Sequence, residues 1–176
     1  MKVNPLMYYA GAVTMIVLAA CSIPAGVELP RKLEPAPDEM VTLVVHARGV
    51  QIYECRVNAE RDDAEWAFIA PEAELFDLRG HLLGRHGAGP MWESLDGSMV
   101  RGSVKQRADA PIAGAIPWLL LKASPDPTPG RLSKVTSILR VNTEGGLAPV
   151  TGCDPTRIGQ PARVPYKADY LFLAQR

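Results

Sequence analysis

Prolines and glycines interrupt this chain so often that long helices have little room to form. The 176 residues include 16 prolines and 15 glycines, which are spread among short apolar runs. Proline and glycine weaken helix interiors and favour turns, whereas short runs rich in β-branched and aromatic residues favour strands. The sequence therefore predicts an all-β fold: a single-domain β-sandwich or irregular β-barrel of about eight to ten short strands, with few helices.

The N-terminal residues have the pattern of a secretion signal. After Lys2, the stretch from Leu6 to Ala20 carries no charge, and it is long for a signal core but short for a membrane span. It ends in the letters LAAC, which resemble a bacterial lipobox, the site where a signal is cut before a lipidated cysteine. We predict a lipoprotein signal peptide over 1–20 and lipidation of Cys21. Ordinary signal cleavage nearby and an uncleaved N-terminal anchor are the alternatives.

A lipid on Cys21 would attach the chain to a membrane without making it span one. Ser22 follows the cysteine. By analogy with enterobacterial lipoproteins, a residue other than aspartate at this place favours sorting to the outer membrane. We therefore expect a lipid-anchored protein of the bacterial cell envelope, on the outer membrane and facing the periplasm, with the membrane as its partner.

Removal of the signal changes the cysteine count. The three cysteines become one lipid attachment site and a pair, Cys55 and Cys153. An even number of remaining cysteines in an oxidising compartment indicates a disulfide, and the chain contains no C-x-x-C motif. We expect a Cys55–Cys153 disulfide, and two buried free thiols are the alternative.

A proline-rich segment over 21–39 lacks hydrophobic periodicity and is expected to be a tether, followed by a single β domain over 40–176. The first expected elements of the domain are strands over 40–47 and 49–57 with a turn at Gly49, and a strand over 65–70 that Pro71 stops. Next come a strand to Leu78, a turn at Arg79-Gly80 and a return strand to His86. A hairpin at Asp96-Gly97 and strands over 134–143 and 166–174 follow. The apolar run at 115–123 fits a buried strand or a short helix. In the second strand, the side chains expected on one face are Gln51, Tyr53, Cys55 and Val57.

Charge and motifs exclude several classes of protein. The 19 basic and 19 acidic side chains balance, which gives no reason to expect a nucleic-acid partner. The letters GRHGAG match neither a dinucleotide fingerprint nor a P-loop, and no G-x-S-x-G elbow occurs. His81 and His86 are five positions apart and would lie on opposite faces of a strand, which argues against a shared metal. We expect no metal site and no cofactor.

The stretch 84–98, GRHGAGPMWESLDGS, contains the candidate pocket or catalytic residues His86, Trp92, Glu93 and Asp96. A histidine beside a carboxylate can act as a general acid or base near neutral pH, so His86 with Glu93 is the candidate catalytic pair. Strand alternation, however, places Trp92 and Glu93 on opposite faces, and the turn gives Asp96 a sufficient role. A structural corner, the rim of a ligand pocket and a catalytic site therefore remain as interpretations.

A series of motifs spans the domain in this order: GVQIYECR, W-x-F-x-x-P-E-A-x-L, G-x-H-x-A-G-P-x-W-E-x-x-D-G-S, A-I-P-W-L-L-L, V-T-x-I-x-R-V-N-T-x-G-G, G-C-D and V-P-Y-x-A-D-Y. Together they resemble the family named domain of unknown function 3455, which comprises secreted bacterial and fungal proteins. The resemblance runs from about Met40 to Phe172 and implies one extracytoplasmic domain, but no reaction. Gly87 departs from the family pattern, in which an aromatic residue is expected after the histidine.

These observations favour a cell-envelope lipoprotein whose β domain is a non-enzymatic binding or structural module, with a small molecule as the candidate ligand. The alternative is an envelope hydrolase or lyase that acts on small molecules or glycans with His86 and Glu93. The two hypotheses differ in what they require of His86. An enzyme needs this side chain in an open cleft beside a carboxylate, whereas a binding or structural module allows it to be buried.

Overall fold

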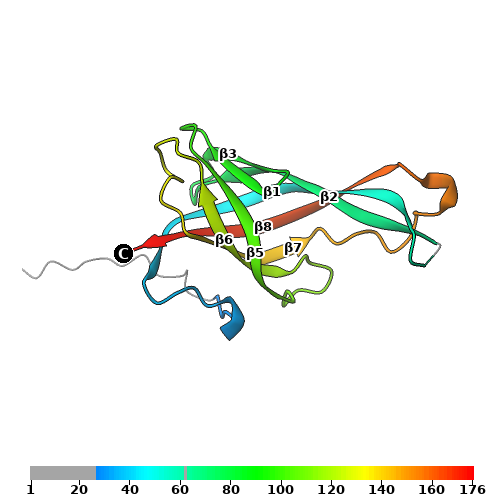
Figure 1. The fold of residues 1–176 in the computed structure, drawn as a ribbon, viewed down its shortest axis with the longest axis horizontal. Helices are drawn as coiled ribbons and strands as arrows, with labels where there is room; N and C mark the ends of the chain where they lie inside the picture. The colour runs from blue at the N-terminus through cyan, green and yellow to red at the C-terminus, as the bar shows by residue number, and fades with distance from the viewer. Residues whose placement is uncertain (1–26, 62) are drawn as a thin grey trace, which may run out of the picture.

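The computed structural model describes residues 27–61 and 63–176, so the predicted signal peptide and the predicted lipidation site at Cys21 lie outside the described residues. Eight strands form one closed antiparallel barrel in which each strand pairs with its neighbours in sequence and the last strand pairs with the first (Figure 1). The strands are β1 (Glu39–Asn58), β2 (Asp63–Phe76), β3 (Leu82–Gly87), β4 (Met91–Ser94), β5 (Met99–Ala108), β6 (Trp118–Pro125), β7 (Ser137–Gly145) and β8 (Pro161–Gln175). Two single-turn 3-10 helices, η1 (Arg31–Leu33) and η2 (Pro155–Arg157), complete the elements of the described residues. The predicted all-β class is confirmed, and the barrel is the observed architecture.

Gly49 does not turn the chain, because β1 runs through it as one strand of 20 residues. The glycine is required there for a different reason. A Cβ atom at position 49 would stand 2.1 Å from the backbone oxygen of Glu72 on β2. Close approach of two backbones, rather than a turn, therefore explains the glycine, and the prediction of two strands joined there is wrong.

Pro71 does not stop its strand either, because β2 continues from Asp63 to Phe76. Pro71 pairs with Gln51 directly beside a shift in the β1–β2 register, and β2 pairs with β3 only from Ala73 onward. Proline is tolerated at bulges and at strand edges because the missing N–H then breaks no ladder hydrogen bond.

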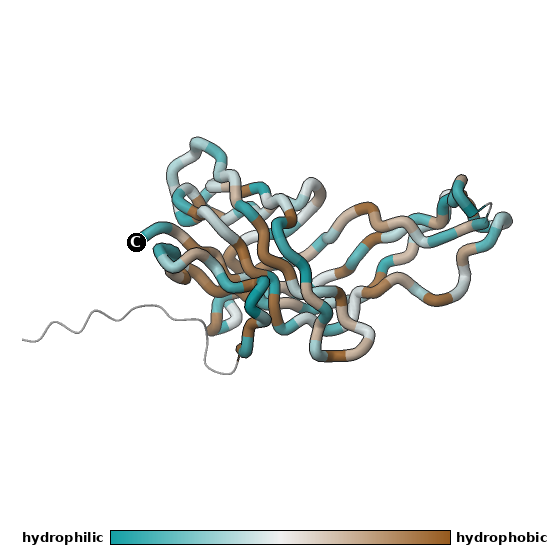
Figure 2. The backbone as a smooth tube through the Cα atoms, turned by 60° about the horizontal axis from the view of Figure 1, so that its bottom comes forward, coloured by the Kyte–Doolittle hydropathy of each residue, from teal (hydrophilic) through white to brown (hydrophobic). Residues whose placement is uncertain are grey.

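Three strands are longer than the barrel needs and form an arm. β1, β2 and β8 extend beyond the barrel body, and Figures 1 and 2 show them projecting together with the segment over 147–160. The disulfide between Cys55 and Cys153 joins β1 to this segment, with 5.3 Å between the Cα atoms. The predicted disulfide is thus confirmed. The Nε1–H of Trp66 donates a second link, to the Thr151 carbonyl at 3.0 Å.

The arm also limits how far strand alternation predicts burial. Gln51, Tyr53 and Cys55 are buried on one face of β1, as expected. Val57 belongs to the same face but is 62% exposed, because it lies in the end of β1 that pairs with β2 alone, beyond the pairing with β8. Phe68 on β2 is likewise exposed, at 54%.

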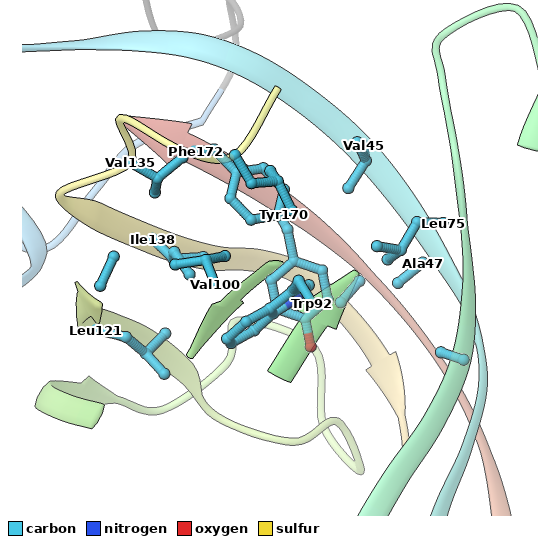
Figure 3. Close-up of a cluster of buried hydrophobic side chains, with 14 of the residues drawn as sticks. Val45, Ala47, Leu75, Trp92, Val100, Leu121, Val135, Ile138, Tyr170 and Phe172 are labelled. Atoms are coloured by element: carbon cyan, nitrogen blue, oxygen red, sulfur yellow. The ribbon is translucent and has the colours of Figure 1, made fainter. Parts of the chain in front are cut away.

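One apolar cluster occupies much of the barrel interior, and aromatic side chains from distant strands meet in it. Figure 3 shows Trp92, Tyr170 and Phe172 together within a surround of aliphatic side chains. The ring of Trp92 lies edge-on to Tyr170, with 5.2 Å between centroids, and edge-on to Phe172 at 6.2 Å. Such edge-to-face contacts stabilise beyond the area that they bury.

A second apolar cluster lies outside the barrel wall. It contains the alternate residues of β6, β7 and β8, including Leu120, Leu139 and Leu171, and it packs against Leu33 of η1. The segment 27–34, here called the strap, covers this outer face, and Leu33 is fully buried. The strands beneath it read as continuous apolar runs because both of their faces are covered.

The strap corrects the prediction of a tether over 21–39. From Val27 onward the described part of this segment is packed on the barrel rather than free of it, since Val27, Leu29 and Leu33 all join the outer cluster. The apolar residues among the prolines are the sequence sign of this packing. They do not recur with the period of a strand or a helix, so the sequence alone does not identify the segment as packed. Within the described residues, no helix has the length and apolar character needed to cross a membrane.

Candidate functional site

His86 lies on the inner face of β3 and is almost fully buried. Its ring stacks on Trp92 of β4, with 4.3 Å between centroids and 9° between planes, and meets Tyr170 edge-on at 5.1 Å. Nδ1 lies 2.8 Å from the carbonyl oxygen of Met91, so Nδ1 carries the proton and donates to it. Burial lowers the pKa of His86 to about 4, which leaves the imidazole neutral at pH 7.

Glu93 lies on the opposite face. Register explains the separation, because His86 pairs with Trp92 across β3 and β4 while Arg85 pairs with Glu93. The Glu93 carboxylate accepts a hydrogen bond from Nε of Arg85 at 2.8 Å, and this partner lowers the pKa of Glu93. The structure therefore does not bring His86 and Glu93 together as a catalytic pair.

Asp96 organises the hairpin between β4 and β5. One carboxylate oxygen accepts from the backbone N–H and the hydroxyl of Ser98, at 3.0 and 2.6 Å, and the other accepts from the backbone N–H of Arg131 at 2.8 Å. These hydrogen bonds hold the pKa of Asp96 well below its usual range. Gly97 follows with φ at 84°, the left-handed conformation that this turn needs. Asp96 thus joins the hairpin to the loop before β7, and its hydrogen bonds are to Ser98 and Arg131 rather than to His86.

The barrel contains a cavity of about 590 Å³ that opens where the arm leaves the barrel. Its inner wall is formed by buried side chains that include Gln51, His86, Trp92 and Tyr170. Its mouth is largely apolar and includes Phe68, Ile69, Val104 and Leu147, all of them exposed. A concave, mostly apolar site with a few convergent polar groups is the usual form of a small-molecule site.

Some polar groups of the inner wall have partners in the protein and others do not: His86, Arg140 and Tyr53 bond to backbone carbonyl oxygens. Six buried side-chain atoms make no hydrogen bond within the described residues. Nε2 of Gln51, Nε1 of Trp92 and the hydroxyl of Tyr170 line this cavity, and each side chain is at most 2% exposed. The other three atoms belong to Ser94, Trp118 and Tyr166, outside the cavity lining, and Tyr166 and Arg140 act on the Tyr170 hydroxyl. Buried polar groups in native proteins nearly always have a partner, because an unpaired one is costly. Three of the six atoms therefore lie around this one cavity.

Arg140 of β7 adds a positive charge to the same wall. Its Nε and Nη2 atoms donate to the carbonyl oxygen of Pro117, at 3.0 and 2.8 Å, which holds the guanidinium in place. Arg107 of β5 lies at the exposed side of the cavity, and no carboxylate is among the lining residues. Burial raises the pKa of Tyr170, so its hydroxyl remains a neutral donor or acceptor.

A separate hollow of about 920 Å³ lies beside Gly87 and Glu93, at β2, β3 and β4. A Cβ atom added at position 87 would meet nothing within 4 Å. A side chain there would lie on the opposite face of β3 from His86, which stacks on Trp92. The missing aromatic at Gly87 therefore alters this hollow and not the barrel cavity. Across residues 27–61 and 63–176, His, Cys, Asp and Glu side chains form no group of three or more that could hold a metal ion.

Fold and cavity together define a class: a small closed antiparallel barrel with a cavity among its inward-facing side chains. A family model described as "Protein of unknown function (DUF3455)" matches residues 35–174, which is most of the chain. The chain therefore belongs to the DUF3455 family, as its motifs indicated. Neither the curated proteins nor the solved structures contain a significant match to it.

The structure also brings together residues that sequence reasoning did not combine. Gln51, Arg140 and Tyr170 belong to β1, β7 and β8, and they meet Trp92 only because the barrel closes. One local signal for them existed. Gln51 is a polar residue on the face that Tyr53 and Cys55 share, and a buried amide is unusual enough to mark a site.

Proposed function

We propose that this protein is a lipid-anchored protein of the cell envelope whose barrel binds a small molecule without transforming it. The observation that carries the proposal is the cavity of about 590 Å³, in which Gln51, Trp92 and Tyr170 present buried polar atoms with no partner in the described protein. A ligand that pairs with them would offset the cost of leaving them unpaired. The volume is within the range of pockets for small organic molecules.

The proposed role is non-catalytic because the candidate catalytic groups are otherwise engaged. His86 donates to the Met91 carbonyl and stacks on Trp92, while the Glu93 carboxylate is held by Arg85 on the other face. A histidine whose pKa is about 4 is a weak base near neutral pH, and general acid–base catalysis works best when that pKa lies near the working pH.

The binding proposal is tested by identifying what co-purifies with the protein from its native host. We expect mass spectrometry of a solvent extract to find a small molecule at about one equivalent with the natural chain. The same molecule should be absent from Leu119→Trp. Leu119 lines the cavity, so the indole ring of the variant would occupy the space of the ligand. The matched control is Leu78→Trp, which makes the same change on an exposed turn outside the cavity.

Equal ligand content in the two variants would contradict binding in the cavity. An empty natural chain that also fails to bind any member of a library of small organic molecules would contradict the binding role itself. Thermal unfolding of each variant shows that it remains folded.

The envelope proposal rests on the N-terminal pattern and on Cys21, and it is tested separately. Incorporation of labelled fatty acid should occur in the natural chain and disappear in Cys21→Ala, since the thiol is the predicted attachment point. Labelling that persists in the variant would contradict the predicted lipid anchor.

A further inference from the structure

The unpartnered groups of the cavity are mainly hydrogen-bond donors. The indole Nε1–H of Trp92 can only donate, Nε2 of Gln51 is the donor end of its amide, and the Tyr170 hydroxyl can donate as well as accept. A ligand that satisfies all three must therefore present acceptor atoms. Their burial places that acceptor group at the inner wall rather than at the mouth.

The charges around the cavity have one sign. Arg140 stands on the inner wall, Arg107 stands on the exposed side, and the lining contains no aspartate or glutamate. Arg140 uses Nε and Nη2 to bind the Pro117 carbonyl, which leaves Nη1 as the donor not used in that contact. A guanidinium held by the backbone is pre-organised for an anion, and hydrogen bonds between ionised groups are about twice as strong as neutral ones.

The mouth of the cavity is lined mostly by apolar side chains. Phe68, Ile69, Val104 and Leu147 are between 40% and 58% exposed there, so an apolar ligand body would cover apolar surface that is now in water. An acceptor group at the inner wall and an apolar body at the mouth describe an amphipathic molecule.

From this arrangement we infer that the ligand is an amphipathic organic anion, with a carboxylate-type head among Gln51, Trp92, Tyr170 and Arg140 and an apolar body against the exposed mouth. The inference rests on the proposed binding function and names its ligand class. A cationic or purely apolar molecule would leave the donors unpaired, and a cation would also be repelled by Arg140.

The test uses three probes with one apolar body: 2-naphthoate, 2-naphthalenemethanol and 2-naphthylmethylammonium. Each is titrated calorimetrically into the full chain in lipid nanodiscs, with empty nanodiscs as the control for partition into lipid. We expect 2-naphthoate to bind at least about tenfold more tightly than the alcohol, and the ammonium compound to show no saturable binding.

Substitutions then locate the head group. Trp92→Phe and Tyr170→Phe each remove one polar atom and keep an aromatic ring, and each should weaken 2-naphthoate about tenfold. Trp118→Phe is the matched control and should leave the affinity unchanged, because Trp118 packs in the outer cluster. Arg140→Gln should remove the preference for the anion over the alcohol, whereas Arg85→Gln, on the outer surface, should retain it.

The outcomes distinguish a failure of the proposed ligand class from a failure of the proposed binding function. Equal affinity for 2-naphthoate and the alcohol, lost in Leu119→Trp, would overturn the anionic class and keep a binding cavity. Saturable binding of the ammonium compound alone would also overturn it. No binding of any probe, with no co-purifying molecule, would show that the cavity holds water only and would overturn both. Thermal unfolding checks that every variant is folded.

Discussion

The buried imidazole of His86 links the stability of this protein to pH. In the unfolded chain a histidine has a pKa of about 6.5, whereas burial lowers the pKa of His86 to about 4. Between these values the unfolded state binds a proton that the native state does not. The free energy of unfolding therefore rises with pH across this window. The contribution of His86 to it is complete above about pH 6.5 and is lost as the pH falls from about 6.5 to about 4.

We predict that His86 alone contributes about 3 kcal/mol to this loss. The measurement is urea unfolding at several pH values between 4 and 7, for the natural chain and for His86→Phe, which keeps a ring against Trp92 but cannot titrate. The variant should have a clearly flatter dependence. Parallel curves for the two proteins would contradict a buried neutral histidine.

Gln51 should cost stability in the absence of ligand. Its Nε2 atom is buried without a partner, so Gln51→Leu, which replaces the amide by an apolar group of similar size, is expected to raise the free energy of unfolding by about 1 kcal/mol. The same substitution should weaken 2-naphthoate. A stabilised variant with unchanged affinity would mean that Gln51 does not face the ligand.

Part of the site was predictable residue by residue. Strand alternation correctly separated Trp92 from Glu93, and the Asp96-Gly97 pair correctly predicted a hairpin, because both depend on a few neighbouring residues. The direction in which His86 faces was left open. It depends on which side of β3 the barrel closes, and that is set by pairing with strands far along the chain.

Among the elements, the strap shows how a segment without strand or helix periodicity can belong to the core. Leu33 of the strap is fully buried against the outer faces of β6 to β8. We predict that Leu33→Ala lowers the free energy of unfolding by about 2–5 kcal/mol, the cost of a cavity at a buried leucine. Leu78→Ala, at a site that is 72% exposed, is the matched control and should change little. Similar small effects in both would show that the strap is not packed in solution.

The disulfide is the covalent element of the arm. It joins positions 98 residues apart, and on the chain-entropy model its loss costs about 4–5 kcal/mol, an upper value. We predict that reduction lowers the denaturation midpoint of the natural chain. The double variant Cys55→Ala with Cys153→Ala should start at the lower midpoint and be insensitive to the reductant. A midpoint that reduction leaves unchanged would contradict this contribution.

The elements also show where sequence signals mislead. Gly49 and Pro71 were interpreted as a turn and a stop because these residue types usually have those roles. In the barrel, a close backbone approach explains the glycine, and a register shift beside a partly unpaired strand accommodates the proline. Both reasons involve a second strand, so the local sequence does not contain them.

At the scale of the whole molecule, composition predicted the all-β class and the cysteine count predicted the disulfide, whereas closure of the sheet is a property of long-range pairing between β1 and β8. Closure is also what creates the function proposed here. It places donors from separate strands around one cavity, whose mouth is lined by exposed apolar side chains of β2, β5 and the segment after β7.

The most direct test of that claim uses the three tryptophans of the chain, Trp66, Trp92 and Trp118. Only Trp92 lines the cavity, since the indole of Trp66 bonds Thr151 on the arm and Trp118 packs in the outer cluster. The measurement is the ¹⁵N–¹H spectrum of the labelled full chain during titration with 2-naphthoate. We predict that the indole N–H signal of Trp92 shifts with saturation while the other two stay in place. A stationary Trp92 signal at saturating probe, or a shift confined to Trp66 or Trp118, would contradict a ligand site inside the barrel.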